Sequence, residues 1–145
     1  MSDPTHVLMI EDNSGDVMLV EEAMASAGLS QSLQVVRDGV DAMDYLRRVG
    51  LYSGAARPDV IVLDLRLPRK SGREVLDEIL ADPELSAIPV VVLSSSKSDL
   101  ELVRALGLRG VACIPKPDTF AGYVDLIRRI EAFRRHPKEG GNHGS

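Results

Sequence analysis

Polar side chains follow four apolar runs of this chain, each at the carboxyl end of its run. They are three acids, a serine and a lysine: Glu11, Asp12, Asp64, Ser94 and Lys116. Carboxylates that share a pocket repel one another, and burying them without a partner is costly. A divalent hard cation would relieve that repulsion, and Mg²⁺ prefers a few carboxylates, some waters and a phosphate oxygen. The residue types therefore indicate a magnesium site if the fold brings them together.

The lysine and the serine extend this chemistry to a phosphoryl group. Lys116 carries a compact positive charge that can reach a carboxylate or phosphoryl oxygen, and Ser94 can donate a hydrogen bond to the same oxygen. Such a set suits an aspartate, Asp64, that attacks phosphorus and becomes an acyl phosphate. Singly, each residue has a plainer explanation, because acids cap helices and serines turn chains. Together, at four strand ends, they favour a functional site.

The elements that must position these residues alternate along the chain. Five short apolar runs predict strands, and they cover residues 6–10, 33–37, 59–63, 89–93 and 110–114. Between and after them, apolar residues at spacings of three and four predict five helices, around Val17–Ala27, Val40–Leu46, Val75–Leu80, Leu102–Leu106 and Phe120–Phe133. Asn13 or Ser14 is expected to cap the first helix, and Gly28 to end it. This alternation predicts an α/β fold with a parallel sheet and helices on both faces. Ligands of such sheets bind beyond the carboxyl ends of the strands.

Length, composition and charge restrict the class of protein. The chain has 145 residues, which suits one domain, and its net charge of −5 argues against nucleic acid as the main partner. The single cysteine, Cys113, excludes an internal disulfide and fits a reducing compartment. No apolar run approaches the roughly 20 residues that cross a bilayer, and no signal peptide precedes the first strand. We expect a cytoplasmic protein that binds no membrane, with a disordered polar tail over residues 137–145.

Four motifs in order resemble those of two-component response-regulator receiver domains. They are "VLMIEDN" (7–13), "VIVLDLRLPRKSG" (60–72), "PVVVLSSS" (89–96) and "PKP" (115–117). The resemblance covers about residues 5–134 and implies a receiver domain over residues 1–136. It also implies a flavodoxin-like doubly wound fold whose five-stranded parallel sheet has the order 2-1-3-4-5. The segments "EDNSGD", "RDGVDAMDYLRRVG" and "RRIEAFRR" look most like the single-domain regulators that serve bacterial phytochromes.

The resemblance assigns roles to the site residues. It implies that Asp64 is the phosphoacceptor and that Asp12, Asp64 and the backbone carbonyl of Arg66 bind Mg²⁺. Glu11 would bind the ion directly or through water. Ser94 would contact the phosphoryl group and relay its arrival, and Lys116 would pair with it. The resemblance further implies a cis peptide bond between Lys116 and Pro117.

Two residues depart from, or add to, the family pattern. Receivers usually carry Tyr or Phe where this chain has Cys113, so the aromatic part of the switch is missing and loop movement around residues 94–96 is one substitute. Cys113 is more simply read as a small buried residue. Arg66 stands beside the pocket, where it either modulates access of phosphodonor and water or is a solvated side chain.

The expected partner is a sensor histidine kinase, for which a bacterial phytochrome kinase is a candidate. Because no output domain is apparent in this chain, the signal is expected to leave by protein contact, by onward phosphate transfer or by competition for phosphate. The apolar positions of the last helix are numerous enough to suggest a homodimer through the fourth and fifth helices, with a wide core stripe as the alternative.

Two other functions compete with a phosphoaccepting regulator. A phosphatase with an aspartyl nucleophile, as in haloacid-dehalogenase-like enzymes, usually needs a second aspartate two residues after the first, where this chain has Arg66. A receiver-shaped adaptor that never binds phosphate is the other alternative, and the complete polar set argues against it. We therefore expect a phosphoacceptor that takes part in its own phosphorylation and dephosphorylation rather than a conventional enzyme.

Overall fold

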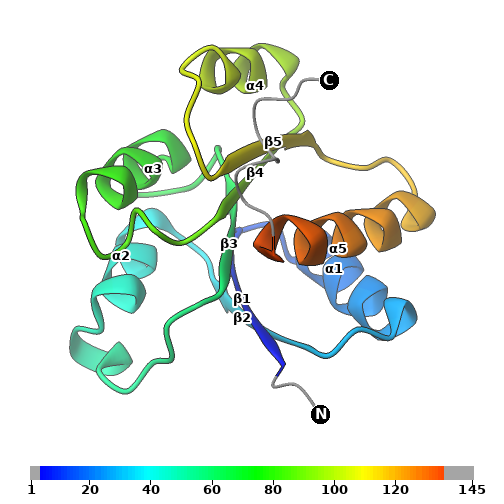
Figure 1. Cartoon of the computed structure of the whole chain (residues 1–145), viewed down its shortest axis with the longest axis horizontal. Helices are drawn as coiled ribbons and strands as arrows, with labels where there is room; N and C mark the ends of the chain where they lie inside the picture. Colours follow the sequence, from blue (N-terminus) through cyan, green and yellow to red (C-terminus); the bar gives the residue numbers. More distant parts are fainter. Residues whose placement is uncertain (1–3, 136–145) are drawn as a thin grey trace.

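A parallel β-sheet of five strands crosses the middle of the molecule, as the computed structural model of residues 4–135 shows (Figure 1). The strands are β1 Thr5–Ile10, β2 Gln31–Val36, β3 Val60–Asp64, β4 Val90–Ser94 and β5 Val111–Pro115. Their order is β2-β1-β3-β4-β5, and every neighbouring pair is parallel. Each apolar run of the sequence thus forms a strand, and the predicted flavodoxin-like order is confirmed.

Helices cover both faces of this sheet. They are α1 Ser14–Ala27, α2 Gly39–Arg47, α3 Gly72–Ala81, α4 Lys97–Arg104 and α5 Phe120–Arg135. In Figure 1, α1 and α5 lie side by side on one face, and α2 and α3 lie on the other. The buried residues of α4 belong to the same cluster as those of α2 and α3. A short 3-10 helix, η1 Gly50–Tyr52, occupies the start of the segment between α2 and β3.

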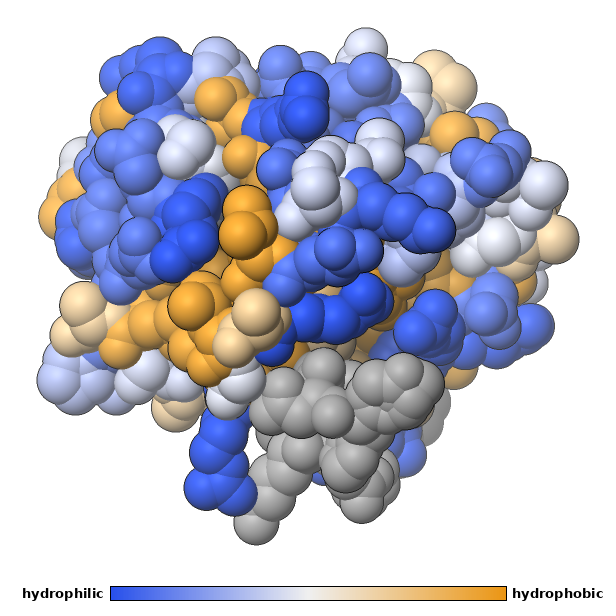
Figure 2. Space-filling view, turned by 90° about the horizontal axis from the view of Figure 1, so that it is seen from above, coloured by the Kyte–Doolittle hydropathy of each residue, from blue (hydrophilic) through white to orange (hydrophobic). Residues whose placement is uncertain are grey.

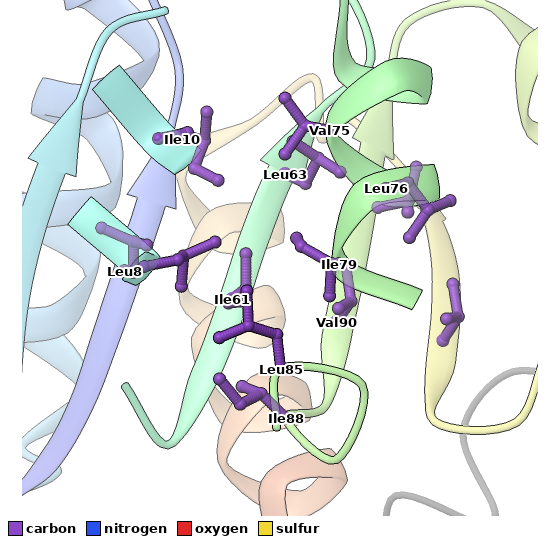
Figure 3. Close-up of a cluster of buried hydrophobic side chains, with 14 of the residues drawn as sticks. Leu8, Ile10, Ile61, Leu63, Val75, Leu76, Ile79, Leu85, Ile88 and Val90 are labelled. Atoms are coloured by element: carbon purple, nitrogen blue, oxygen red, sulfur yellow. The ribbon is translucent and has the colours of Figure 1, made fainter. Parts of the chain in front are cut away.

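Strand β3 is fixed from both sides because all five of its residues are buried. Side chains alternate across a strand, so Ile61 and Leu63 face one cluster, shared with Leu76 and Ile79 of α3 (Figure 3). Val60 and Val62 face the other cluster, with residues of α1 and α5. Each such side chain contributes about 1.5–3 kcal/mol when fully buried. The strand that carries Asp64 at its end is therefore rigidly placed.

Capping residues fix where α1 and α3 begin and where α1 ends. The Asn13 side chain accepts a hydrogen bond from the backbone amide of Asp16 and begins α1, and Gly28 ends that helix in the left-handed conformation, as predicted. Ser71 and Glu74 form a capping box at the start of α3. Gly72 follows directly, and a Cβ there would collide with the backbone carbonyl oxygen of Asp64. The absence of a side chain at Gly72 lets α3 begin directly against the end of β3.

Two predictions about local structure need correction. Leu102 and Leu106 are exposed, whereas Leu100 and Val103 are the buried residues of α4, so the predicted stripe was out of phase. A spacing of three places Leu100 and Val103 on one helix face, which packs on the sheet. No peptide bond in residues 4–135 is cis, so the expected cis bond before Pro117 is wrong. The lysine side chain is long enough to reach the acids from a trans backbone.

The predictions about the tail, about membranes and about an edge strand have different outcomes. The predicted tail, residues 137–145, lies outside the residues that the structure describes. Within residues 4–135, no helix is both long and apolar enough to span a bilayer. Pro115 ends β5, which is an edge strand as predicted and can therefore accommodate a residue without an amide hydrogen.

Candidate phosphoacceptor and metal site

Three acids meet at the carboxyl edge of the sheet. Strands β1 and β3 are neighbours, with Ile10 opposite Leu63, so the residues that follow them lie next to each other. Glu11, Asp12 and Asp64 each offer a carboxylate oxygen, and these oxygens lie within 4.8 Å of one another. Glu11 is 1% exposed and Asp64 is 6% exposed, while Asp12 is open to solvent. The predicted convergence of the acids is present in the fold.

Lys116 reaches this acidic cluster from the end of β5. Its Nζ lies 2.7 Å from Oδ2 of Asp16, 3.1 Å from Oε1 of Glu11 and 3.3 Å from Oδ2 of Asp64. Burial lowers the pKa of Lys116, but hydrogen bonds to Asp16 and Glu11 and the nearby negative charges outweigh it and raise the pKa above the usual value. The ammonium therefore stays charged at neutral pH.

Glu11 carries the strongest electrostatic strain in the site. Burial raises the pKa of Glu11 to about 7, and the neighbouring Asp64 adds to this effect while Lys116 opposes it. Its Oε2 accepts a hydrogen bond of 3.2 Å from the backbone amide of Asn13. Its Oε1 is fully enclosed, and the charged group placed beside it is the ammonium of Lys116. The single charge of Lys116 cannot balance the carboxylates of Glu11, Asp12, Asp16 and Asp64. The cluster therefore keeps a net negative charge, which suits a hard divalent cation with oxygen ligands.

Arg66 lies at the mouth of the cleft that holds the acids. Its backbone amide donates a 3.1 Å hydrogen bond to Oδ1 of Asp64, and this contact orients the carboxylate. Its side chain is 75% exposed, and its Nε lies 3.6 Å from Oδ2 of Asp99 in α4. The cleft has a volume of about 590 Å³, and its walls consist of Glu11, Asp12, Asn13, Asp64, Arg66, Ser95, Ser96 and Lys116.

Ser94 ends β4 close to the acids but faces a different way. It is 1% exposed, and its Oγ accepts a 3.0 Å hydrogen bond from the backbone amide of Ser96. Its backbone carbonyl accepts a bond from the amide of Lys116, which ties β4 to β5 at the site. Ser95 and Ser96 line the acidic cleft, whereas Ser94 lines the adjacent cleft beside Tyr123. The structure thus brings four of the five predicted side chains together and places the fifth alongside.

Asp16 belongs to the site although sequence reasoning gave it no role. It is the last acid of "EDNSGD" and lies in the first turn of α1, three residues after the capping Asn13. Its Oδ2 makes the shortest of the Lys116 contacts, and its Oδ1 accepts a 3.4 Å hydrogen bond from the Tyr123 hydroxyl. The spacing from the cap was the available signal, because residues at the start of a helix after a strand turn toward the strand ends.

Cys113 lies in β5, which β4 separates from β3, the strand that carries Asp64. It is 8% exposed, and burial raises the pKa of its thiol. Its backbone carbonyl accepts a 2.7 Å hydrogen bond from Nη2 of Arg104. A buried thiol with a raised pKa is a poor nucleophile, and the small apolar interpretation of Cys113 fits this environment.

Comparisons with known proteins agree with this architecture. The response regulator receiver domain family matches residues 7–128. The response regulator Rcp1 of Synechocystis sp. is 36% identical over 130 residues, which is 90% of this chain and 88% of that protein. The probable methanogenesis regulatory protein FilR2 of Methanothrix harundinacea is 40% identical over 136 residues, covering 92% and 84%.

Solved structures give the same result in three dimensions. The phosphorylated cyanobacterial phytochrome response regulator RcpA has a TM-score of 0.80 and 42% identity, covering 92% of this chain and 95% of that one. The Mn²⁺-bound form of Rcp1 has a TM-score of 0.77 and 38% identity, covering 90% and 94%. That Rcp1 structure holds Mn²⁺, and in this chain Glu11, Asp12 and Asp64 form a cluster of acids that could hold a metal ion. The chain belongs to the response regulator receiver domain family and is related to the phytochrome response regulators.

Proposed function

We propose that this protein is a response regulator that accepts a phosphoryl group on Asp64 from a histidine kinase, in a reaction that needs Mg²⁺. One observation carries the proposal. The buried Asp64 carboxylate lies within reach of two further acids and 3.3 Å from the Lys116 ammonium. That arrangement places a nucleophile, cation ligands and a fixed positive charge at one point. The adaptor alternative needs none of the three, and the phosphatase alternative would also need an acid/base aspartate two residues after Asp64, where this chain has Arg66.

Each group of the chain has a defined part in the transfer. An Asp64 oxygen attacks phosphorus and forms a P–O bond, while the P–N bond of the donor phosphohistidine breaks and its electron pair stays on the imidazole. Lys116 pairs with a phosphoryl oxygen, and the backbone amide of Arg66 holds the other oxygen of Asp64. Ser94 can donate to the phosphoryl group once its hydroxyl turns from the amide of Ser96.

The proposed ion ligands are Asp12, Asp64 and the backbone carbonyl of Arg66, with Glu11 bound directly or through water. Bound Mg²⁺ would neutralise charge on the carboxylates and on the incoming phosphoryl oxygens. We choose Mg²⁺ because every donor in the set is an oxygen and the cleft is open enough to leave waters on the ion.

The proposed partners follow from the relatives and from the surface. The 42% identity to RcpA, a phytochrome response regulator, supports a phytochrome kinase as the proposed phosphodonor, and we propose that the transfer takes place in the cytoplasm. For a homodimer, the exposed apolar residues of the α4 and α5 side are Leu102, Leu106 and Phe120. Figure 2 looks onto the side where α4 lies in Figure 1, and apolar residues form an orange band there among hydrophilic ones. Tyr123, Leu126, Ile127, Ile130 and Phe133 of α5 are buried, so most of its apolar residues serve the core.

The test is labelling by a small phosphodonor. Wild-type protein incubated with acetyl phosphate and Mg²⁺ is expected to gain the mass of one phosphoryl group, and Asp64→Asn is expected to gain none. Asp77→Asn is the matched control, because Asp77 is an exposed acid of α3 that pairs only with its helix neighbour Arg73 among the described residues. Continuous release of phosphate from esters would support the phosphatase alternative. A protein that never forms the adduct with donor or phosphorylated kinase would support the adaptor.

A further inference from the structure

Lys116 joins two clefts, and Asp16 and Asp64 lie in different ones. The acidic cleft contains Asp64 but not Asp16. The second cleft, of about 480 Å³, lies between the start of α1 and the start of α5, and Asp16, Lys116 and Tyr123 are among its lining residues. A phosphoryl group on Asp64 would occupy the first cleft. Its negative oxygens would draw the ammonium into that cleft and away from Asp16.

The hydrogen-bonding capacity of the ammonium makes this a competition. Lys116 has three N–H donors, and three carboxylates surround it, those of Glu11, Asp16 and Asp64. A phosphoryl oxygen must therefore displace or weaken an existing contact. Glu11 is 1% exposed and would lose the charged partner of an enclosed oxygen. Asp16 has a side chain that is 22% exposed, so water can replace the lysine there at lower cost.

Asp16 is also the link to α5. The Tyr123 hydroxyl donates to Oδ1 of Asp16, and the rest of that tyrosine is buried, with 4% exposure. Burial raises the pKa of Tyr123, and the charge of Asp16 adds to the shift. The hydroxyl therefore remains a donor at neutral pH. Its bond of 3.4 Å is long while Asp16 is engaged with Lys116, and a released carboxylate is free to turn toward it.

We propose that Asp16 is a positioning residue that holds Lys116 while Asp64 is unmodified, and that its release on phosphorylation strengthens the bond from Tyr123 and so reports the event to α5. The inference rests on the proposed phosphorylation of Asp64. It adds a route from the phosphoacceptor to α5 that passes through α1 and through neither Ser94 nor Cys113.

The composition of the chain offers a direct reporter. The sequence holds three tyrosines and no tryptophan. The rings of Tyr45 in α2 and Tyr52 in η1 lie near each other at an angle of 58°, with centroids 5.3 Å apart. Replacing both by phenylalanine in the full chain leaves Tyr123 as the single tyrosine fluorophore. A carboxylate that accepts a stronger hydrogen bond from a tyrosine quenches its emission.

The experiment follows that emission while acetyl phosphate and Mg²⁺ are added, with the adduct measured in the same samples by intact mass. We expect the Tyr123 emission to fall as the adduct forms. In the same background, Asp16→Asn is expected to form the adduct but to lose this fall in emission. Asp118→Asn is the charge-matched control, because Asp118 lines the same cleft and is exposed. It is expected to keep the response.

The outcomes separate the inference from the proposed function. An adduct on Asp64 without any change in Tyr123 emission overturns the inference and leaves the function standing. An Asp16→Asn protein that still shows the full change also overturns it. No adduct in any variant overturns both proposals. Thermal unfolding of each variant shows whether it is folded. If Asp16→Asn is unfolded, the parent background still tests the inference, because an adduct without a fall in Tyr123 emission overturns it.

Discussion

Replacing Glu11 by glutamine should remove most of the pH dependence of Mg²⁺ binding. Burial and the neighbouring Asp64 raise the pKa of Glu11 to about 7, so a proton competes with the cation at this residue near neutral pH. With that pKa, about one tenth of the Glu11 side chains are ionised at pH 6 and about nine tenths at pH 8. The cation binds the ionised form better. Affinity for Mg²⁺ is therefore expected to rise about tenfold between pH 6 and pH 8, with most of the change near pH 7.

Isothermal titration calorimetry at these two pH values measures the effect. Runs in buffers of different ionisation enthalpy also count the protons released on binding, and close to one proton per ion is expected at pH 6. The Glu11→Gln variant should bind more weakly and with a nearly constant affinity. Glu21→Gln, a change at an exposed acid of α1, should behave like the wild type. An affinity that is equal at both pH values in the wild type would refute the assignment of the raised pKa to a metal-linked carboxylate.

Three further predictions concern the site's support and the surface. Lys116→Met leaves Glu11 and Asp64 without their cation, so the free energy of unfolding in urea at pH 8 without metal should fall by about 3 kcal/mol, and Mg²⁺ should restore part of it. Gly72→Ala puts a Cβ against the Asp64 carbonyl, so denaturant unfolding should show a loss of about 3 kcal/mol, whereas Gly54→Ala, with open space around it, should lose far less. Leu102→Ser should shift sedimentation of the phosphorylated protein from dimer to monomer, and a wild type that is monomeric throughout would contradict the dimer proposal.

The strands were predictable because burial on both faces leaves a simple pattern. The run that becomes β3 is apolar at every position up to Asp64 and consists of Val, Ile and Leu, which is typical of a buried strand. The polar residues at the strand ends were predictable for the same reason, since a parallel sheet sends the carboxyl ends of its strands to one edge. The order of the strands could not be predicted from this pattern. It was predicted from the resemblance to receiver domains.

The missed details depend on rotation about a helix or a side-chain bond. The sequence could not tell which face of α4 would pack, since Leu100, Leu102 and Val103 are all apolar and only a helix phase distinguishes them. Likewise, the direction of the Ser94 hydroxyl depends on a turn that offers it the amide of Ser96. Asp16 was missed because it lies in the first turn of α1 and not directly after a strand, which was the pattern that identified the other site residues.

The acidic cluster also explains why this edge of the sheet needs so firm a support. Raising the pKa of Glu11 to about 7 means that the folded protein, above the carboxyl's usual pKa of 4.5, loses stability as the pH rises toward 7, because the folded state holds a proton that the unfolded chain releases. The buried side chains around β3 must offset that cost while the site is free of metal. A cation that binds the ionised carboxylates of the folded state restores part of the lost stability. The same unfavourable charge that lowers the stability of the metal-free fold is therefore what draws the ion, and the phosphoryl group it neutralises, to Asp64.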